Sequence, residues 1–421
     1  MSVIGGDDYT RVNYRYRIKK CTFMNNNDSI DLEPMQIRSI ELLNDYEKNY
    51  YPIMKVNMSM SNDLYYTILK NKNTCTLFLR ITKFRMYPDK KDSEKSVESN
   101  FINGNFNLIL SEGTDDMAAQ MKRDSASYDF KKITKETNEV SISNDKPVSF
   151  YIYSNDTLSS RNTVNVVYNE ASIADTITAI LQTNKIKKAH FVKPDNTSIY
   201  NQIFVPPLPF IKSLSFIDTY YGIYKKGSTI FNDLNKLFII PYDGVSEKVS
   251  DITNIVVPNG KISSSIASSS GMITVKNKKD QYIIADAASL EINNASITNN
   301  YISGNDVIVI DGSNSSVKGS SSAVNKTSAN ANVVENKTMN KYLHSMYTAQ
   351  TSAASYIINL RLADYDMDAI DLSHAIKLVF EDTAIMNKYK GKYIISNVSS
   401  VLSTEGYDEM TLDSSVTFKK V

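Results

Sequence analysis

The segment from Ser213 to Gly244 reads SLSFIDTYYGIYKKGSTIFNDLNKLFIIPYDG, and it is the most informative stretch of the chain. It places four tyrosines and three phenylalanines around Gly222 and Gly227, and it contains no cluster of residues that could carry catalysis. Aromatic side chains bury much surface and have few rotatable bonds, so a dense group of them makes a contact rigid at low entropic cost. The pattern predicts a packed joint and favours a component of an assembly over an enzyme.

A helix is predicted upstream of this stretch, from Ser172 to Thr183. Ser172 and Asp175 form a Ser-x-x-Asp start signal, in which side chains satisfy the free amide groups of a first helical turn. The apolar residues that follow recur every three or four positions, as they do on the buried face of an amphipathic helix. A strand is predicted before this helix, from Phe150 to Tyr153.

A proline-rich element lies between that helix and the aromatic stretch. Pro206–Pro209 reads PPLP and predicts a stiff, extended elbow, because proline fixes its own backbone and restricts the residue before it. The aromatic stretch then predicts a second helix from Leu214 to Tyr224, ended near Gly227, and a turn and strand from Ile230 to Ile240. This middle block is therefore expected to mix α and β elements.

Both ends of the chain show the alternation that is typical of strands with one buried face. Val56–Met60 reads VNMSM and Ile358–Leu362 reads INLRL. After a similar interval each is followed by a second alternating segment, Leu77–Ile81 in one case and Ile376–Phe380 in the other. This similarity is either that of any two barrel hairpins or an internal repeat of one barrel type. In the second case three chains would present six similar modules and could join a six-fold tube to a three-fold partner.

We therefore predict a mainly β fold with an α/β middle: two small β-barrel domains plus an α+β domain and long polar loops. Within the Ser/Asn-rich part of the chain, short strands are predicted at Met272–Val275, Tyr282–Ala285 and Val307–Ile310. The expected divisions are 1–88 for the first β-barrel, 89–146 for a polar insertion or extended loop, 147–245 for the α/β domain with the proline elbow and the aromatic joint, 246–348 for a Ser/Asn-rich insertion with short strands, and 349–421 for the strands of the second β-barrel.

Composition narrows the classes of partner. The chain has 421 residues, of which 42% are hydrophobic, and a formal net charge of +1. This balance gives no strong attraction to a polyanion, so no nucleic-acid binding is expected and lysine-rich stretches are interpreted as solvated faces. No apolar run is long enough for a membrane span, and the N-terminal residues lack the pattern of a signal peptide. The two cysteines, Cys21 and Cys75, are expected to be free thiols of a protein made in a reducing cytoplasm.

No residue pattern identifies a catalytic, cofactor or metal site. The aspartates between Asp364 and Asp371 are interpreted as solvated bends after a strand, in preference to a hydrolytic pair or a calcium loop. His190, His344 and His374 are scattered and have no nucleophile motif beside them. Two distant cysteines and three histidines do not suggest a zinc site. We therefore predict no enzymatic activity, no cofactor and no metal.

Three pieces of the middle block resemble a known family. They are Asn201–Pro207 (NQIFVPP), Phe216–Tyr224 (FIDTYYGIY) and Gly227–Leu234 (GSTIFNDL). In this order they resemble the baseplate hub proteins of contractile-tailed bacteriophages. The resemblance is clearest from Asn165 to Asp243 and extends to both predicted barrels, whereas the polar and the Ser/Asn-rich insertions have no counterpart in it.

The resemblance implies a structural role. Hub proteins of this family form a homotrimer with two barrel domains per chain, and their pseudo-six-fold ring meets the tail tube protein on one side and the central spike protein on the other. The chain would then be a virion protein of the tail baseplate, made in the cytoplasm of the host bacterium, with neighbouring baseplate proteins as further partners. One alternative is the hub of a phage-like contractile injection system. Another is a particle-borne adhesin or cell-wall hydrolase, with the polar arms as binding loops.

The elbow and the aromatic joint supply the candidate interface residues. Tyrosine is enriched at protein interfaces, but these tyrosines could instead pack the core of the middle block, or could do both. We expect Tyr221→Ala or Gly222→Val to impair assembly and to leave no enzymatic phenotype. The candidate interface residues are Pro206, Pro207, Tyr220, Tyr221, Gly222, Tyr224, Gly227 and Phe231.

Overall fold

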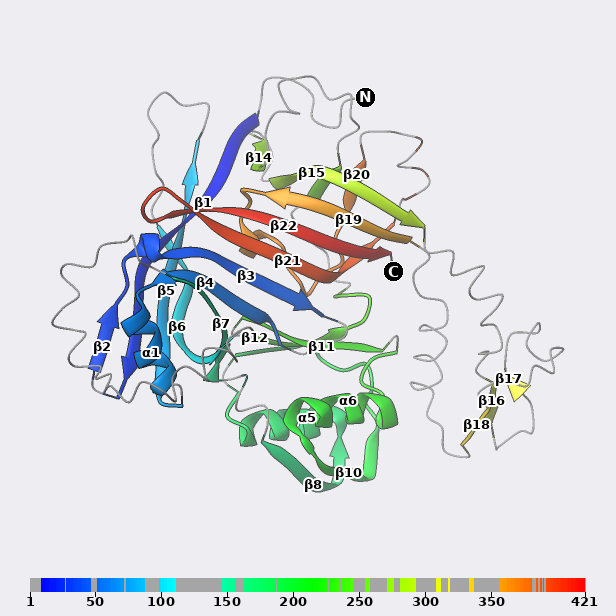
Figure 1. Cartoon of the computed structure of the whole chain (residues 1–421). Coiled ribbons are helices and arrows are strands. Elements are labelled where there is room, and N and C mark those ends of the chain that lie inside the picture. Colours follow the sequence, from blue (N-terminus) through cyan, green and yellow to red (C-terminus); the bar gives the residue numbers. More distant parts are fainter. Residues whose placement is uncertain are drawn as a thin grey trace.

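Strands dominate the computed structural model of the chain (Figure 1). They form one 14-stranded sheet and three sheets of two or three strands, so the predicted mainly β fold with an α/β middle is confirmed. The described residues are 9–26, 28–46, 51–71, 73–87, 98–110, 146–155, 157, 162–186, 188–225, 227–234, 236–245, 254–257, 271–275, 281–292, 308–311, 317–318, 333–336, 356–380, 384, 387, 389 and 391–420.

Eight strands of the large sheet pair in a closed circuit of antiparallel neighbours, which makes a barrel. The closing pair joins the two ends of the chain, since Tyr16 lies opposite Met410 and Arg17 lies opposite Glu409. Alternating residues along these strands turn one row of side chains inward. In circuit order the strands are β1 (Tyr9–Asn25), β5 (Cys75–Met86), β6 (Ser99–Leu110), β7 (Lys146–Ser154), β4 (Ile53–Met60), β3 (Ile37–Asp45), β21 (Tyr393–Glu405) and β22 (Glu409–Lys420).

A second, smaller circuit shares β1 and β22 with the first. It closes through the pairs β1–β14, β14–β15, β15–β19 and β19–β22. The predicted strands Met272–Val275 and Tyr282–Ala285 are both present, the second as part of a longer strand. The added strands are β14 (Gly271–Val275), β15 (Gln281–Ile292) and β19 (Tyr356–Ala363), and β13 (Asn254–Val257) and β20 (Leu378–Phe380) extend the sheet beyond β15.

Strand β1 is long enough to serve both circuits. Its first residues, Tyr9 to Val12, pair with β14, and the rest of the strand pairs with β5. The two segments that look alike in sequence fall into different circuits, because Val56–Met60 belongs to β4 and Ile358–Leu362 to β19. Each circuit draws strands from both ends of the chain. The five-part division by residue number stays a prediction.

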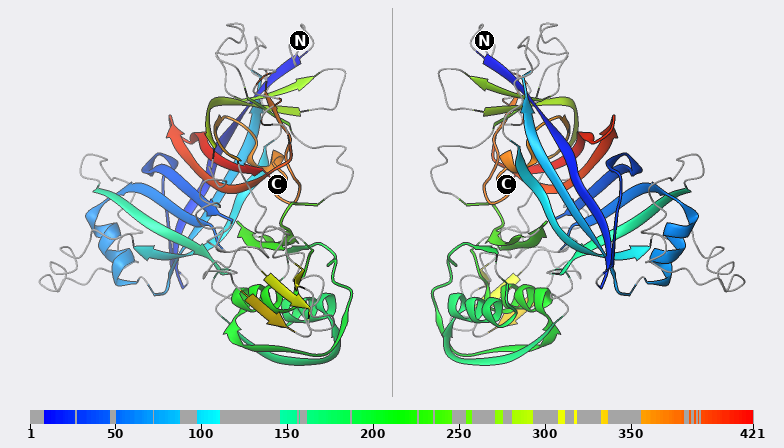
Figure 2. Two further views of the ribbon diagram at one scale, coloured as in Figure 1. Left: turned by 90° about the vertical axis from the view of Figure 1, so that its right-hand side faces the viewer. Right: turned by 90° about the vertical axis from the view of Figure 1, so that its left-hand side faces the viewer.

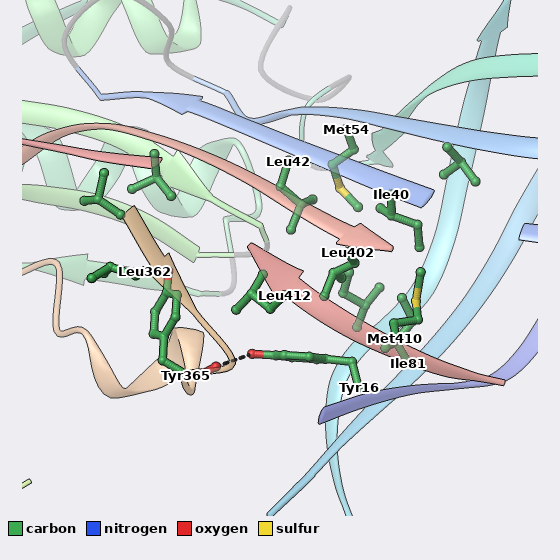
Figure 3. Packing of buried hydrophobic residues seen from close by; sticks show 14 of the residues in the cluster. Tyr16, Ile40, Leu42, Met54, Ile81, Leu362, Tyr365, Leu402, Met410 and Leu412 are labelled. Carbon is green, nitrogen blue, oxygen red and sulfur yellow. Dashed lines mark hydrogen bonds between the residues drawn. The ribbon is translucent and has the colours of Figure 1, made fainter. Parts of the chain in front are cut away.

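The core of the first barrel continues to the junction with the second (Figure 3). Tyr16 of β1 is fully buried, and its hydroxyl donates a hydrogen bond to the backbone carbonyl of Tyr365 at 3.1 Å. Such a partner is needed, because an unpaired buried hydroxyl costs about 1–3 kcal/mol. The apolar side chains labelled around this pair are Ile40, Leu42, Met54, Ile81, Leu362, Leu402, Met410 and Leu412.

The first barrel also contains a helix where only strands and turns are predicted. Within the residues 1–88 that are predicted as the first β-barrel, the strands are interrupted by α1 (Asn62–Lys70), which was not predicted. The hydroxyl of Ser61 accepts the backbone N–H of Leu64 at 3.3 Å and caps the helix. The sequence signal is weaker than at Ser172, because no acidic residue stands at the third helical position to complete a capping box.

The middle block forms a layered unit beside the barrels (Figures 1 and 2). Strands β11 and β12, with β9 parallel to β12, lie on the barrel side, the helices α5 and α6 follow, and the ribbon β8–β10 is the outermost layer. A second hydrophobic core fills this unit. The bounds are β8 (Thr163–Ser172), α5 (Ile173–Thr183), β9 (Ala189–Phe191), β10 (Ile199–Pro209), α6 (Phe210–Tyr221), β11 (Ser228–Asp233) and β12 (Lys236–Pro241).

Both helices of this unit are predicted, one with better bounds than the other. Helix α5 begins after Ser172, whose hydroxyl accepts the backbone N–H of Asp175 at 3.2 Å, so the start signal is confirmed. Helix α6 begins directly after Pro209 and not at Leu214, because a proline at the N-cap needs no amide partner. It ends at Gly222, whose φ of 74° stops the helix before the predicted position.

Smaller elements complete the described chain. The predicted polar insertion or extended loop at 89–146 contains β6 and the first residue of β7, and its residues 89–97 and 111–145, like most of the Ser/Asn-rich insertion, lie outside the described residues. Among the helices that are described, none combines the length and the apolar character needed to cross a membrane. The remaining elements are β2 (Asp28–Asp31), which pairs with β1, the 3₁₀ helices η1 (Pro34–Gln36) and η5 (Met367–Ala369), and a separate sheet of β16 (Ile308–Asp311), β17 (Val317–Lys318) and β18 (Val333–Asn336).

Candidate assembly surface

The turn after α6 holds the aromatic joint in place. Asn196 is buried, and its Nδ2 donates to the backbone carbonyls of Tyr221 and Gly222 at 2.9 and 2.7 Å, which satisfies the free end of the helix. The carboxylate of Asp218 accepts one backbone N–H from the turn and one from the start of β11. Burial raises the pKa of Asp218, although these hydrogen bonds favour its ionised form. Polar side chains therefore tie the helix end to the following strand.

Two of the candidate interface residues lie inside the chain. Tyr224 is buried. Its hydroxyl can donate to either of two backbone carbonyls, one next to β9 at 2.5 Å and one in β12 at 3.0 Å. Burial raises the pKa of this phenol. Phe231 stacks on Phe238 with ring centroids 4.9 Å apart and also contacts Tyr46 of the barrel at 4.4 Å. Tyr224 and Phe231 therefore pack the middle unit, and Phe231 also fixes this unit against the barrel.

Tyr221 and the two prolines shape the outer ribbon. The Tyr221 hydroxyl accepts the backbone N–H of Phe204 in β10 at 3.0 Å, and its ring meets Tyr200 edge to face at 5.2 Å. Pro206 and Pro207 lie where the register between β10 and β8 shifts. Proline has no N–H for a strand ladder, so an irregularity in the pairing is where a strand tolerates it. The predicted extended conformation of this segment is confirmed.

The eight predicted interface residues divide between core and surface. Gly222 and Gly227 are buried and have positive φ angles of 74° and 91°. Pro207 and Tyr220 are exposed, and Tyr220, at 62% exposure, rests against Phe216 with ring centroids 4.3 Å apart. In the single chain, therefore, only part of the aromatic joint is available to a partner.

Three further exposed apolar side chains lie on the ribbon, and they were not among the predicted residues. Phe204 and Val167 are cross-strand partners that are 47% and 50% exposed, and Ile199 at the start of β10 is 74% exposed. Ile203 and Val205 are fully buried toward the helices, so Phe204 between them points to the opposite face. The signal was present in the sequence, since a phenylalanine stands at the outward position of an alternating strand.

We call Val167 and Phe204 the outer apolar face, because Ile199 has the strand parity of the inward-facing Ile203 and Val205. A contiguous exposed apolar patch on a single chain is a common mark of a contact surface. Four of the seven large hydrophobic residues that are exposed in the described chain belong to β8, β10 or α6, which makes this unit the principal candidate for a contact surface. The seven are Leu43, Ile109, Val167, Ile199, Phe204, Tyr220 and Tyr407.

Charged groups hold the junction between the barrels. The ammonium group of Lys83 in β5 donates to Asp366 and to Asp368, both at 2.5 Å. Burial would lower the pKa of Lys83, but the two carboxylates outweigh it and raise the pKa. The Asp366 side chain is only 15% exposed, so the interpretation of this cluster as solvated bends is wrong for this residue.

Asp371, Ser373 and His374 lie together but do not form a catalytic relay. The Ser373 hydroxyl donates to Asp371 at 2.6 Å, and Nδ1 of His374 lies 2.8 Å from Asp371 and 2.9 Å from Ser373. A relay needs one imidazole nitrogen for the acid and the other for the nucleophile, whereas here both contacts use Nδ1. Burial would raise the pKa of Asp371, but the hydrogen bonds from Ser373 and the neighbouring His374 lower it. Among the described residues there is also no cluster suited to hold a metal ion.

Family comparison identifies the class of protein. The sequence matches the family described as Bacteriophage PBS1 gene 109 protein over residues 3–421, and the chain belongs to this family. The resemblance to a bacteriophage protein is therefore confirmed. No curated protein sequence gives a match.

Three solved structures are similar to this chain over most of its length. The 43 kDa tail protein of prophage MuSo2 from Shewanella oneidensis superposes with a TM-score of 0.46 at 9% identity, over 94% of this chain and 97% of that one. The tail protein from Neisseria meningitidis MC58 gives 0.48 at 9% identity, over 96% of each chain. A chain of the Francisella PdpA–VgrG complex gives 0.48 at 10% identity, over 99% of this chain and 53% of that one.

Proposed function

We propose that this bacteriophage protein is a structural component of the tail, a baseplate hub that joins the six-fold tail tube to the three-fold central spike of a contractile tail. The observation that carries the proposal is the pair of closed strand circuits that share β1 and β22. Three chains with two barrels each present six barrels around a three-fold axis, which suits a tube on one side and a spike on the other. Membership in a bacteriophage family supports a place in the virion.

The mechanism we propose is geometric and involves no catalysis. The hub holds its place in a ring through apolar contacts, and it is made in the host cytoplasm before it enters the baseplate. The side-by-side barrels supply the symmetry match, and the layered middle unit supplies a contact surface. The arrangement of Asp371, Ser373 and His374 supports this view, because it lacks the geometry of a hydrolytic relay.

The outer apolar face and Tyr220 are the proposed contact residues. They are the part of the middle unit that a neighbouring chain can reach, whether that neighbour is another copy in the homotrimer or an adjoining baseplate protein. Of the predicted interface residues, Tyr224, Gly227 and Phe231 would act from inside, by holding this unit in shape. Burial of exposed aromatic and branched side chains is the usual source of affinity in such contacts.

The first test is the mass of the purified chain by light scattering, alone and mixed with candidate tube, spike and baseplate proteins. We expect a homotrimer, alone or on mixing, and a ring with six similar lobes when it is imaged. Phe204→Asp should abolish the contact that this face makes. Tyr407→Asp is the matched control, because Tyr407 is also exposed but lies in the β21–β22 turn. A chain that stays monomeric with every neighbour contradicts the proposal.

Two further measurements separate the alternatives. Detection of the chain in purified, infectious virions supports a phage tail, whereas its presence only in DNA-free contractile particles supports an injection system. Turnover of peptidoglycan, or tight glycan binding by a monomer, would favour the hydrolase or adhesin instead.

A further inference from the structure

The two strands of the outer ribbon differ in how their free edges are protected. Within the described chain, β8 and β10 pair only with each other, so each has a second edge that faces away from its partner. On β10 this edge is blocked by Pro206, Pro207 and Pro209, which have no N–H to donate. It is also capped, because the Tyr221 hydroxyl accepts the N–H of Phe204 and lies 3.4 Å from its carbonyl oxygen. Such devices protect a sheet edge against further pairing.

The backbone of β8 at Val167 faces the open edge. Phe204 lies opposite Val167, and both backbone groups of Phe204 turn to Tyr221, so this cross-strand pair has no ladder hydrogen bonds. The N–H and C=O of Val167 therefore point away from β10. The hydrogen bond from the Phe210 N–H to the Asn162 carbonyl, at 2.9 Å, gives the same result. Asn162 faces β10, and it is an odd number of residues from Val167.

Three neighbours present their backbone in the same direction. Thr163, Asn165 and Asn169 have the parity of Val167, so their N–H and C=O groups also face the open edge. All four residues are exposed, and the ribbon is the outermost layer of the middle unit (Figure 2). In the described part of the chain, no other strand pairs with this edge. A row of unpaired backbone groups is a template for another strand.

The sequence of this edge is complementary to a second copy of itself. Asn165–Asn169 reads NVVYN, so an antiparallel copy centred on Val167 places Val167 opposite its counterpart and Asn165 opposite Asn169. A two-fold axis requires an uncharged residue at its centre, because like charges directly opposite each other are destabilising. The nearest charged residue, Glu170, would lie about 20 Å from its counterpart, a distance at which salt screens exposed charges.

We propose that two copies of this chain pair through β8, antiparallel about Val167, to form a four-stranded sheet in the order β10–β8–β8–β10. About six backbone hydrogen bonds would join the two edges. Pairing also covers an edge that would otherwise favour unspecific aggregation. The contact is two-fold and separate from the three-fold ring, so it does not depend on the proposed hub. Where the ring also forms, the product is a hexamer.

The test is the mass of the full chain by light scattering and sedimentation velocity, from about 5 to about 200 µM, because an edge this short makes a small and weak contact. We expect the mass to double with concentration, from monomer to dimer or from trimer to hexamer. A monomer or trimer that never doubles overturns the pairing, and the trimer leaves the hub proposal intact. A dimer that forms no ring, alone or with its neighbours, contradicts the hub and supports the pairing.

A proline variant distinguishes edge pairing from packing of the outer apolar faces. Val167→Pro removes an outward N–H and keeps the hydrogen bonds to β10, so we expect pairing to be lost and the circular dichroism to be unchanged. Val167→Thr is the matched control, because it keeps the N–H and a β-branched side chain, and it should pair like the wild type. Phe204→Asp lies one strand away from the new contact and should weaken pairing less than about threefold. Loss of pairing in Phe204→Asp and not in Val167→Pro would overturn the proposal.

Exchange of charges tests the position of the axis. Val167→Lys and Val167→Glu each place like charges opposite each other, so we expect neither variant to pair alone. An equimolar mixture should pair, because opposite charges then meet at the axis, and added salt should weaken this pairing. A folding defect cannot produce such a rescue. A mixture that stays unpaired overturns the proposal, and so does an edge that is occupied only by a strand of a different tail protein.

Discussion

The junction of the two barrels and the outer ribbon β8–β10 break the usual rule of polar outside and apolar inside in opposite ways. At the junction, Lys83 and Asp366 are paired with little exposure of either side chain. On the ribbon, Phe204 and Val167 are exposed to solvent in the single chain. Buried ion pairs add little stability by themselves, but an arrangement of the chain that separates the two charges is costly in free energy. Exposed apolar groups contribute favourable free energy only when a partner covers them. The first region therefore fixes the chain's own geometry, and the second is suited to contact with a partner.

The largest effect on folding is expected at the junction. Lys83→Ala leaves the carboxylate of Asp366 buried without a cation beside it, so we expect a loss of about 3 kcal/mol in the free energy of unfolding. Urea titration followed by fluorescence measures it. Lys20→Ala is the matched control, because Lys20 is half exposed and lies 3.8 Å from Asp31, and it should cost less than about 1 kcal/mol. Equal losses in both variants would mean that the junction pair is not special.

The next effect concerns the contact between the middle unit and the barrel. The pKa of Asp233 is raised to about 6 from 3.8, so the folded chain binds more protons than the unfolded chain between these values. Its contribution to stability is therefore lost as the pH rises from about 4 to about 6. Asp233→Asn should raise the stability at pH 7.5 by about 3 kcal/mol and remove this pH dependence. Urea midpoints measured from pH 4 to pH 7.5 test it, and an unchanged slope would show that Asp233 is ionised normally.

A smaller effect is expected in the turn behind the outer ribbon. Gly222→Ala places a Cβ on a residue with a φ of 74°, which should cost about 1–2 kcal/mol. Gly104→Ala in β6 is the control, because its new Cβ would meet its nearest neighbours at 4.0 Å, an ordinary contact distance. Thermal midpoints of the two variants compare them. If Gly104→Ala is the more harmful, backbone strain is not what makes Gly222 necessary.

The smallest effect on the fold is expected on the outer ribbon itself. Phe204→Ser should change the free energy of unfolding of the isolated chain by less than about 0.5 kcal/mol, because the ring is already half exposed. Ile203→Ser next to it should cost about 3 kcal/mol, because Ile203 is fully buried. Chemical denaturation of the two variants side by side measures the contrast. A large loss at Phe204 would place its ring in the core and remove it from the contact surface.

Local patterns in the sequence predicted most of the elements. Alternation identified β4, β5 and β19, the Ser172 start signal identified α5, and the prolines identified an extended segment. These succeed because each depends on residues that are close in sequence. Helix α1 was missed because its cap at Ser61 carries no acidic partner, and the start of α6 was misplaced because the aromatic pattern obscured the signal at Pro209.

The candidate surface was only partly predictable. The aromatic joint was found, but its members divide between core and surface, since Tyr224 is buried and Tyr220 is exposed. Composition could not separate them, because both are tyrosines in the same helix-and-turn segment. Phe204 could have been found from strand parity alone, because Ile203 and Val205 on either side of it point into the core.

The sequence by itself determined that this chain is mainly β, where most of its strands lie, and that an aromatic segment ends its middle block. Only the tertiary structure decided that β1 pairs with β22, which closes one circuit and opens a second from the same two strands. It also decided that Asn44 meets Asp233 and that Lys83 meets Asp366. The physical reason is that these contacts join residues far apart along the chain, and such pairings depend on how the whole sheet closes and leave no local pattern in the sequence.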